Sequence, residues 1–140
     1  MFRFVKKWLA RGDEPEHLRR GRLGEYAAKR HLKAAGWKFL VANFKTSDSE
    51  IDLVFRDEEC LVFVEVKART EGGWTRPAAA VDQRKRSLLS KAAREYVRKL
   101  SDPNVKFRFD IVEVLLVDGG VSEIRHIPNA FPLTKAKRHA

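Results

Sequence analysis

The chain has 140 residues, 44% of them hydrophobic, which suits one domain with a buried core. Its formal net charge of +10 is typical of a domain that binds a polyanion such as nucleic acid, with charge that serves only solubility as the alternative. Cys60 is the only cysteine, which excludes a disulfide framework and predicts a cytoplasmic location, and the absence of an apolar run of about 18 residues predicts no stable membrane insertion.

Hydrophobic periodicity predicts two helices and five strands. They are expected over residues 21–35 (helix), 37–44 (strand), 50–68 (hairpin), 81–100 (helix), 106–117 (strand) and 121–127 (strand). The order αβββαββ predicts an α/β fold in which a mixed central sheet is flanked by helices. We expect an N-terminal extension over 1–20, a folded domain over 21–127 and a basic C-terminal tail over 128–140.

The apolar residues predict which faces are buried. The first helix is expected to bury a stripe and to stop at Gly36; the stripe is Ala28, Leu32 and Ala35. The hairpin is apolar on both faces, as in a central strand pair covered by helices on both sides. One of its faces is expected to carry Ile51, Leu53, Val64 and Val66, and the other Val54 and Phe63.

The hairpin also brings charged residues together. If it is symmetric about its central Glu-Glu pair, Val54 faces Phe63 and Asp52 faces Glu65. Directly opposed residues on one face have Cβ atoms about 4.5–5.5 Å apart. Lys67 lies two residues beyond Glu65, so its side chain points to the same face. Two carboxylates and an ammonium are therefore predicted to converge.

This arrangement suggests metal-dependent chemistry. Like charges that oppose each other on a sheet are unfavourable, and a divalent cation between Asp52 and Glu65 would remove the conflict. Hydrolysis of a phosphodiester needs charge neutralisation and an activated water, which Mg²⁺ or Mn²⁺ on carboxylates supplies with help from a nearby lysine. The alternative is a structural pair neutralised by Lys67 or Arg69.

The chain carries an ordered set of short stretches: Leu23-Gly24-Glu25-x-x-Ala28, Gly36-Trp37, Asn43, Ser49-Glu50-Ile51-Asp52-Leu53-Val54, Phe63-Val64-Glu65-Val66-Lys67-x-Arg69, Ala80-Val81 with Lys85, and Arg108-Phe109-Asp110-Ile111-Val112. In this order they resemble the restriction-endonuclease-like (PD-(D/E)xK) superfamily, with its αβββαβ core, and more narrowly the bacterial YraN family, which is similar to Holliday-junction resolvases. The resemblance covers about residues 21–115. It implies a nuclease-like domain over 21–127 and, if resolvase-like, a homodimer.

The resemblance implies roles for four residues. Asp52 and Glu65 are expected to bind the metal, Lys67 to be the catalytic lysine, and Glu25 to complete the metal site. Glu25 has a second reading, because a carboxylate in the first turn of a helix interacts favourably with the helix dipole.

The basic residues suggest where nucleic acid binds. Candidates are Arg69, Arg84, Lys85, Arg94 and Arg98, four of them on the basic face of the helix over 81–100. A solvated helix face is the alternative for those four, and a local ion pair is the alternative for Arg69. The best overall interpretation is a Mg²⁺- or Mn²⁺-dependent endonuclease that cuts branched or otherwise structured DNA. The alternative is a nucleic-acid-binding protein that keeps the nuclease fold without physiological cleavage.

Overall fold

The structure is a computed structural model, and it describes residues 14–70, 81–102 and 104–135. Its elements are α2 (Glu16–Ala34), β1 (Lys38–Lys45), β2 (Glu50–Asp57), β3 (Cys60–Thr70), α3 (Gln83–Arg98), β4 (Lys106–Val117) and β5 (Gly120–Phe131). The predicted order αβββαββ is confirmed. Residues 1–13 of the expected extension, residues 71–80 between the predicted hairpin and the second predicted helix, and residues 136–140 of the expected tail lie outside the described residues.

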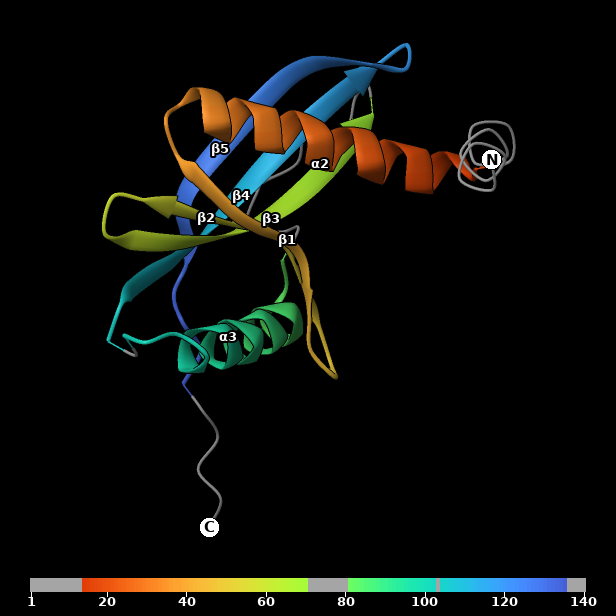
Figure 1. Cartoon of the computed structure of the whole chain (residues 1–140). Coiled ribbons are helices and arrows are strands. Elements are labelled where there is room, and N and C mark those ends of the chain that lie inside the picture. Colours follow the sequence, from red (N-terminus) through yellow and green to blue (C-terminus); the bar gives the residue numbers. More distant parts are fainter. Residues whose placement is uncertain (1–13, 71–80, 103, 136–140) are drawn as a thin grey trace, which may run out of the picture.

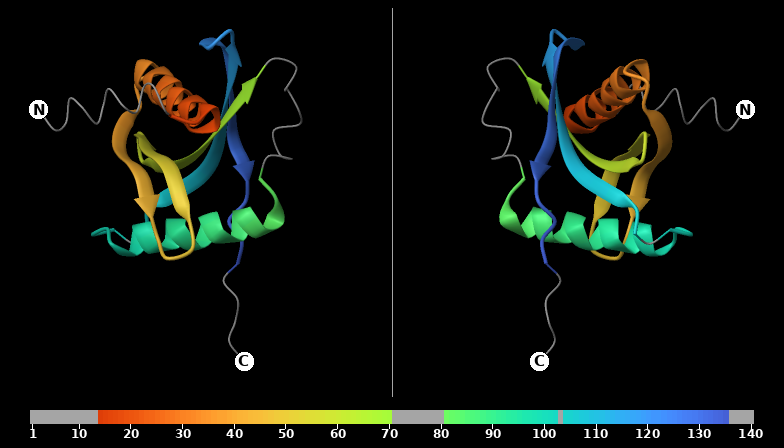
Figure 2. Two further views of the ribbon diagram at one scale, coloured as in Figure 1. Left: turned by 90° about the vertical axis from the view of Figure 1, so that its right-hand side faces the viewer. Right: turned by 90° about the vertical axis from the view of Figure 1, so that its left-hand side faces the viewer.

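The strands form one sheet in the order β1-β2-β3-β4-β5. β3 and β4 are parallel, while the other neighbouring pairs are antiparallel, so the sheet is mixed as predicted. Figures 1 and 2 show α2 on one side of the sheet and α3 on the other. The α/β fold with a mixed sheet between helices is thus confirmed. No helix in the described part of the chain is long and apolar enough to cross a bilayer.

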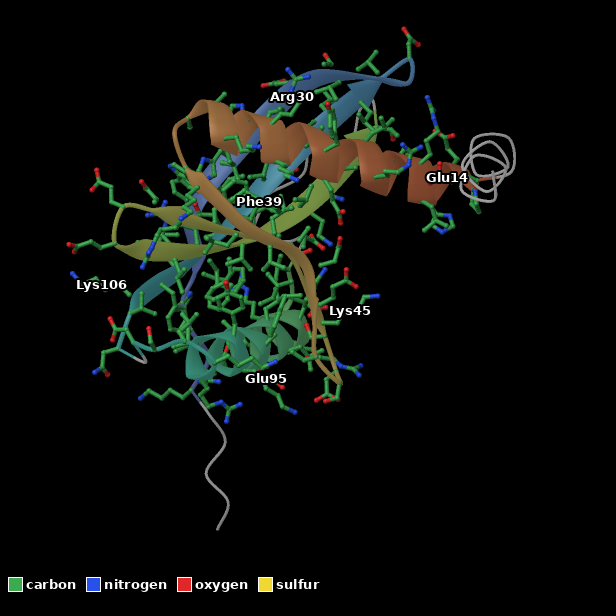
Figure 3. All side chains as sticks on the ribbon, viewed as in Figure 1. Glu14, Arg30, Phe39, Lys45, Glu95 and Lys106 are labelled. Carbon is green, nitrogen blue, oxygen red and sulfur yellow. The ribbon has the colours of Figure 1, made fainter. Side chains whose placement is uncertain are left out.

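Each helix covers its own core. Between the sheet and α3 lies a cluster that includes Phe63 and Ile111, and side chains fill this space in Figure 3. Between the sheet and α2 lies a second cluster, which includes Phe55 and Val112. Because β2 and β3 contribute to both clusters, they are the central strands that the apolar hairpin predicts.

α2 ends at the predicted glycine. Gly36 has φ +95°, and the N–H groups of Gly36 and Trp37 donate to the carbonyls of Lys33 and Leu32, which together form a Schellman motif. Ala35 is the C-cap and is exposed, so its expected burial is wrong. The buried stripe continues instead toward the N-terminus, to Gly24. A Cβ atom at Gly24 would lie 3.1 Å from Cβ of Ala68, so glycine lets α2 approach β3 closely.

α2 and β5 extend furthest beyond their predicted bounds. α2 starts at Glu16, with Pro15 as its N-cap residue, and Glu16 places an acidic side chain in the first turn, which the helix dipole favours. β5 continues through Pro128 to Phe131, because an edge strand tolerates a residue without an N–H. Phe131 stacks on Phe109 with ring centroids 4.8 Å apart, which holds the end of β5 on the core.

Candidate functional site

The β2–β3 hairpin has the predicted register from its turn to the residues next to Asp52 and Glu65. Val54 pairs with Phe63, and regular pairing of β2 with β3 runs to Leu53 and Val64. Continuing this register places Asp52 beside Glu65, which matches the electrostatic coupling of the two carboxyls. The hairpin geometry therefore brings both predicted carboxylates together.

At Asp52 the strand departs from regular alternation. Ile51 lies in the same cluster as Val54, on the α3 side, whereas the sequence placed it on the opposite face. The neighbouring β1 residue Asn43 has φ +54°, a left-handed conformation that asparagine tolerates, and the β1–β2 pairing passes over it. Oδ2 of Asp52 accepts a hydrogen bond of 2.8 Å from the N–H of Val66. The side chain of Asp52 thus takes a backbone donor of β3.

Glu65 is buried, and it pairs with a residue from α3. Nζ of Lys85 lies 3.2 Å from Oε2 of Glu65, so the two side chains form an ion pair. Oε2 of Glu65 has no hydrogen bond besides this ion pair, although the side chain is only 6% exposed. A buried acceptor without a donor is costly unless a ligand or ion satisfies it.

Burial and neighbouring groups shift the pKa of three groups of the site, Asp52, Lys67 and Lys85. Burial raises the pKa of Asp52 to about 8, and hydrogen bonding and repulsion from Glu65 add to this, against the opposing effects of Val66 N–H and Lys85. Burial and the adjacent Lys85 lower the pKa of Lys67. The pKa of Lys85 is raised, because attraction to Glu65 and hydrogen bonding to Lys67 outweigh its burial. Near neutral pH the Asp52 carboxyl thus keeps its proton.

Glu25 approaches the site from α2. It follows Gly24, whose close packing on β3 brings the helix down to the sheet. Burial and the charge of Asp52 raise the pKa of Glu25, while a hydrogen bond from Asn43 lowers it. Nδ2 of Asn43 also donates to Oε1 of Glu50 at 2.7 Å. The left-handed Asn43 therefore links the edge of the sheet to Glu25.

The residues of the site fit one small divalent cation better than a three-carboxylate cage. In residues 14–70, 81–102 and 104–135, no three His, Cys, Asp or Glu side chains form a group able to hold a metal ion. Asp52 and Glu65 nevertheless present two neighbouring carboxyls and an oxygen without a donor. Mg²⁺ keeps several waters and needs only one or two protein carboxylates, so this pair suits it.

The candidate nucleic-acid-binding residues occupy three environments. Arg84 and Arg98 are exposed on α3, and Arg94 is partly exposed. Lys85 points away from that face to Glu65. Arg69 lies on β3, with Nε 3.5 Å from Oε2 of Glu113 on β4. The basic helix is thus divided between an exposed face and the carboxylate cluster.

Sequence reasoning missed two features, and the first is the pairing of Lys85 with Glu65. The side chain of Asp82 caps α3 by accepting from the N–H of Lys85, so Lys85 lies in the first turn. A lysine there is unfavourable with the helix dipole, which is a signal that it has another partner. The other feature is Glu113, which is fully buried in the apolar run of β4, where a lone carboxylate is conspicuous.

The fold and these residues define an α/β protein consistent with a restriction-endonuclease-like core. The family described as "Uncharacterised protein family UPF0102" matches residues 24–114, and the chain belongs to this family, also called YraN. UPF0102 proteins similar to this chain include one from Porphyromonas gingivalis, 43% identical over 84% of this chain and 87% of its own length. Another, from Trichlorobacter lovleyi, is 41% identical over 81% of this chain and 90% of its own length.

Proposed function

We propose that the protein is a divalent-metal-dependent endonuclease that hydrolyses phosphodiesters in branched or otherwise structured DNA. The observation that carries this proposal is the buried Glu65, whose Oε2 lacks a hydrogen-bond donor, beside Asp52 at the point where regular pairing of β2 and β3 ends. A carboxyl whose pKa is strongly raised, as that of Asp52 is, beside a second carboxyl is typical of a functional site.

The residues would divide the chemistry among them. Asp52 and Glu65 would hold Mg²⁺ or Mn²⁺, which when bound neutralises charge on the phosphate and lowers the pKa of a bound water. Lys67 would donate to a phosphate oxygen or orient the attacking water, because it lies on the same face of β3 as Glu65. Glu25, near Asp52, would add a third acidic group from α2.

The charge of the chain supports a nucleic acid as substrate. A net charge of +10 favours a polyanion, and exposed Arg84 and Arg98 extend this charge along α3. The preference for branched DNA comes from the family resemblance to resolvases. Two symmetric cuts need two sites, so we also propose a homodimer, testable by sedimentation with and without a four-way junction. The single cysteine supports a cytoplasmic location.

A cleavage assay tests the proposal. Linear, flapped and four-way DNA are incubated with the protein and Mg²⁺, Mn²⁺ or EDTA. We expect metal-dependent cleavage that Asp52→Asn, Glu65→Gln and Lys67→Ala each reduce to background while DNA binding persists. Lys91→Gln is the control, because Lys91 is exposed and pairs with Asp48 away from the carboxyls. Cleavage by Asp52→Asn at the parent's rate and purity would show that the site is wrongly assigned.

A second candidate function is nucleic-acid binding without cleavage. The observation that favours it is Lys85, which already supplies a positive charge to Glu65 and so neutralises the carboxyl pair without metal. This candidate predicts that DNA binding is unchanged by EDTA, and that none of the three DNA substrates is cut with either metal.

A further inference from the structure

Glu113 is a buried carboxylate that the proposed mechanism does not use. It lies in the middle of β4 and is 0% exposed. In the described part of the chain neither of its side-chain oxygens has a hydrogen-bond donor. It is in register with Lys67 on β3 and opposite Arg125 on β5, so it lies in the same row as a candidate catalytic residue.

Glu113 forms an ion pair with Arg69. Nε of Arg69 lies 3.5 Å from Oε2 of Glu113, and this nitrogen is also buried without a hydrogen bond. The rest of the Arg69 side chain reaches solvent, with 27% of its surface exposed. The pair therefore links a fully buried charge to a partly exposed guanidinium, two residues along the strand from Lys67.

Stability alone is a weak reason for this pair. Desolvating two charges costs several kcal/mol per ion, and apolar residues of similar volume often serve a core equally well or better. Ile111, the residue two positions before Glu113 on the same face of β4, is a fully buried apolar residue. A carboxylate retained beside it suggests a role in holding the group that it contacts.

We infer that Glu113 is a positioning residue that holds Arg69 for contact with a backbone phosphate next to the one at Lys67. This inference rests on the proposed function. Residues two apart on a strand are separated by about 6.6 Å, close to the spacing of neighbouring phosphates along a nucleic-acid strand. A guanidinium is suited to bind phosphate through two hydrogen bonds, and a fixed counter-ion at Nε leaves the far edge of its plane for that contact.

Binding to a four-way DNA junction, in EDTA and over a range of salt concentration, tests the inference. Bulk electrostatics predicts that Glu113→Gln binds DNA more tightly, because the variant loses a negative charge. Positioning predicts the opposite: about tenfold weaker binding and a salt slope lower by about 0.9, as for the loss of one phosphate contact. Arg69→Gln should give the same two changes, and the double variant should be no weaker than either single one.

The matched control is Glu59→Gln, at the exposed turn between β2 and β3, which makes the same charge change. It should bind as tightly as the parent or slightly tighter. Arg69→Lys is the second variant, for the case in which Glu113→Gln does not fold. It keeps the charge but loses the guanidinium plane. Positioning therefore predicts weaker DNA binding, whereas bulk charge predicts no change in affinity.

Two results would overturn the inference. One is that folded Glu113→Gln, verified by its melting temperature, binds as Glu59→Gln does. The other is that Arg69→Lys keeps the parent's affinity and salt slope. If the parent protein itself does not bind DNA, the proposed function fails, and this inference fails with it.

Discussion

The carboxyl of Asp52 lies where its protonated form is favoured. Burial and Glu65 raise its pKa to about 8, above the ordinary 3.8, so the folded protein holds this proton more tightly than the unfolded chain does. The contribution of Asp52 to the free energy of unfolding is therefore greatest below about pH 4 and is lost as pH rises toward 8. Asp52 thus makes the metal-free fold less stable at the pH where a metal ligand must be ionised.

Asp52→Asn should stabilise the metal-free protein at pH 8 to 9. The amide oxygen can still accept from Val66 N–H, while the buried charge is removed. We expect a gain of about 1 kcal/mol, as is usual when a functional group is removed from a site. The difference between variant and parent, measured by thermal unfolding at several pH values, should shrink as pH falls toward 4.

The same pair of proteins reports on the metal. A ligand at a hundred times its Kd adds about 2.7 kcal/mol to the form that binds it, so Mg²⁺ or Mn²⁺ should raise the melting temperature of the parent and hardly that of Asp52→Asn. If the parent does not respond to about 10 mM metal, or both proteins respond equally, Asp52 and Glu65 are a structural pair in the free protein.

At the scale of elements, the site depends on how two helices meet the sheet. α3 brings Lys85 to Glu65 from one side, and α2 brings Glu25 toward Asp52 from the other. The central strand β3 supplies the residues between them. Substitutions in either helix should therefore change the electrostatic environment of Asp52 and Glu65.

Lys85→Gln should increase metal affinity. The Lys85 ammonium contacts Oε2 of Glu65, where the proposed divalent cation would bind, so removing the ammonium would remove a competitor. Because Lys85 is 38% exposed, solvent screens the pair, and the gain should not exceed about tenfold. Titration calorimetry with Mn²⁺ measures it, with Lys91→Gln as the surface control. An equal or lower affinity in Lys85→Gln would argue against competition at this carboxylate.

Gly24→Val should destabilise the fold. A Cβ at Gly24 meets Ala68 at 3.1 Å and Val66 at 3.6 Å, so a branched side chain must push α2 away from β3, at a cost of about 1–3 kcal/mol. Gly21→Val is the matched control in the same helix, since nothing lies within 4 Å of a Cβ there. Chemical denaturation of both variants compares them. Equal stability of the two would mean that the close approach of α2 is not required.

At the scale of the whole molecule, the sequence was enough to predict what depends on local pattern. Alternation and turn length gave the pairing of Val54 with Phe63, and Gly36 marked the end of α2. The place of Lys85 in the first turn of α3 signals that it has a partner, but that this partner is Glu65 depends on how α3 sits on the sheet. Burial of Glu113 likewise depends on both neighbouring strands and on what covers them.

The distribution of charge over the molecule predicts which basic residues of α3 are available to bind a polyanion. Of the basic residues on α3, Arg84 and Arg98 are exposed and Arg94 is partly exposed, whereas Lys85 and Lys91 already pair with carboxylates. If the three arginines contact DNA, changing them together to Gln should lower the log–log salt slope by up to about 2.7, since each neutralised phosphate contributes about 0.9.

The control is Lys91→Gln with Lys99→Gln, two further charge removals on exposed positions of the same helix region. Lys99 lies over the ring of Phe44 and Lys91 against Asp48, so both have partners within the protein and should contribute less to the slope. Fluorescence anisotropy with duplex and four-way DNA over a range of salt measures all three proteins. An unchanged slope in the triple variant would assign this face of α3 to solvent, and would leave the residues around Lys67 and Arg69 as the DNA-binding surface.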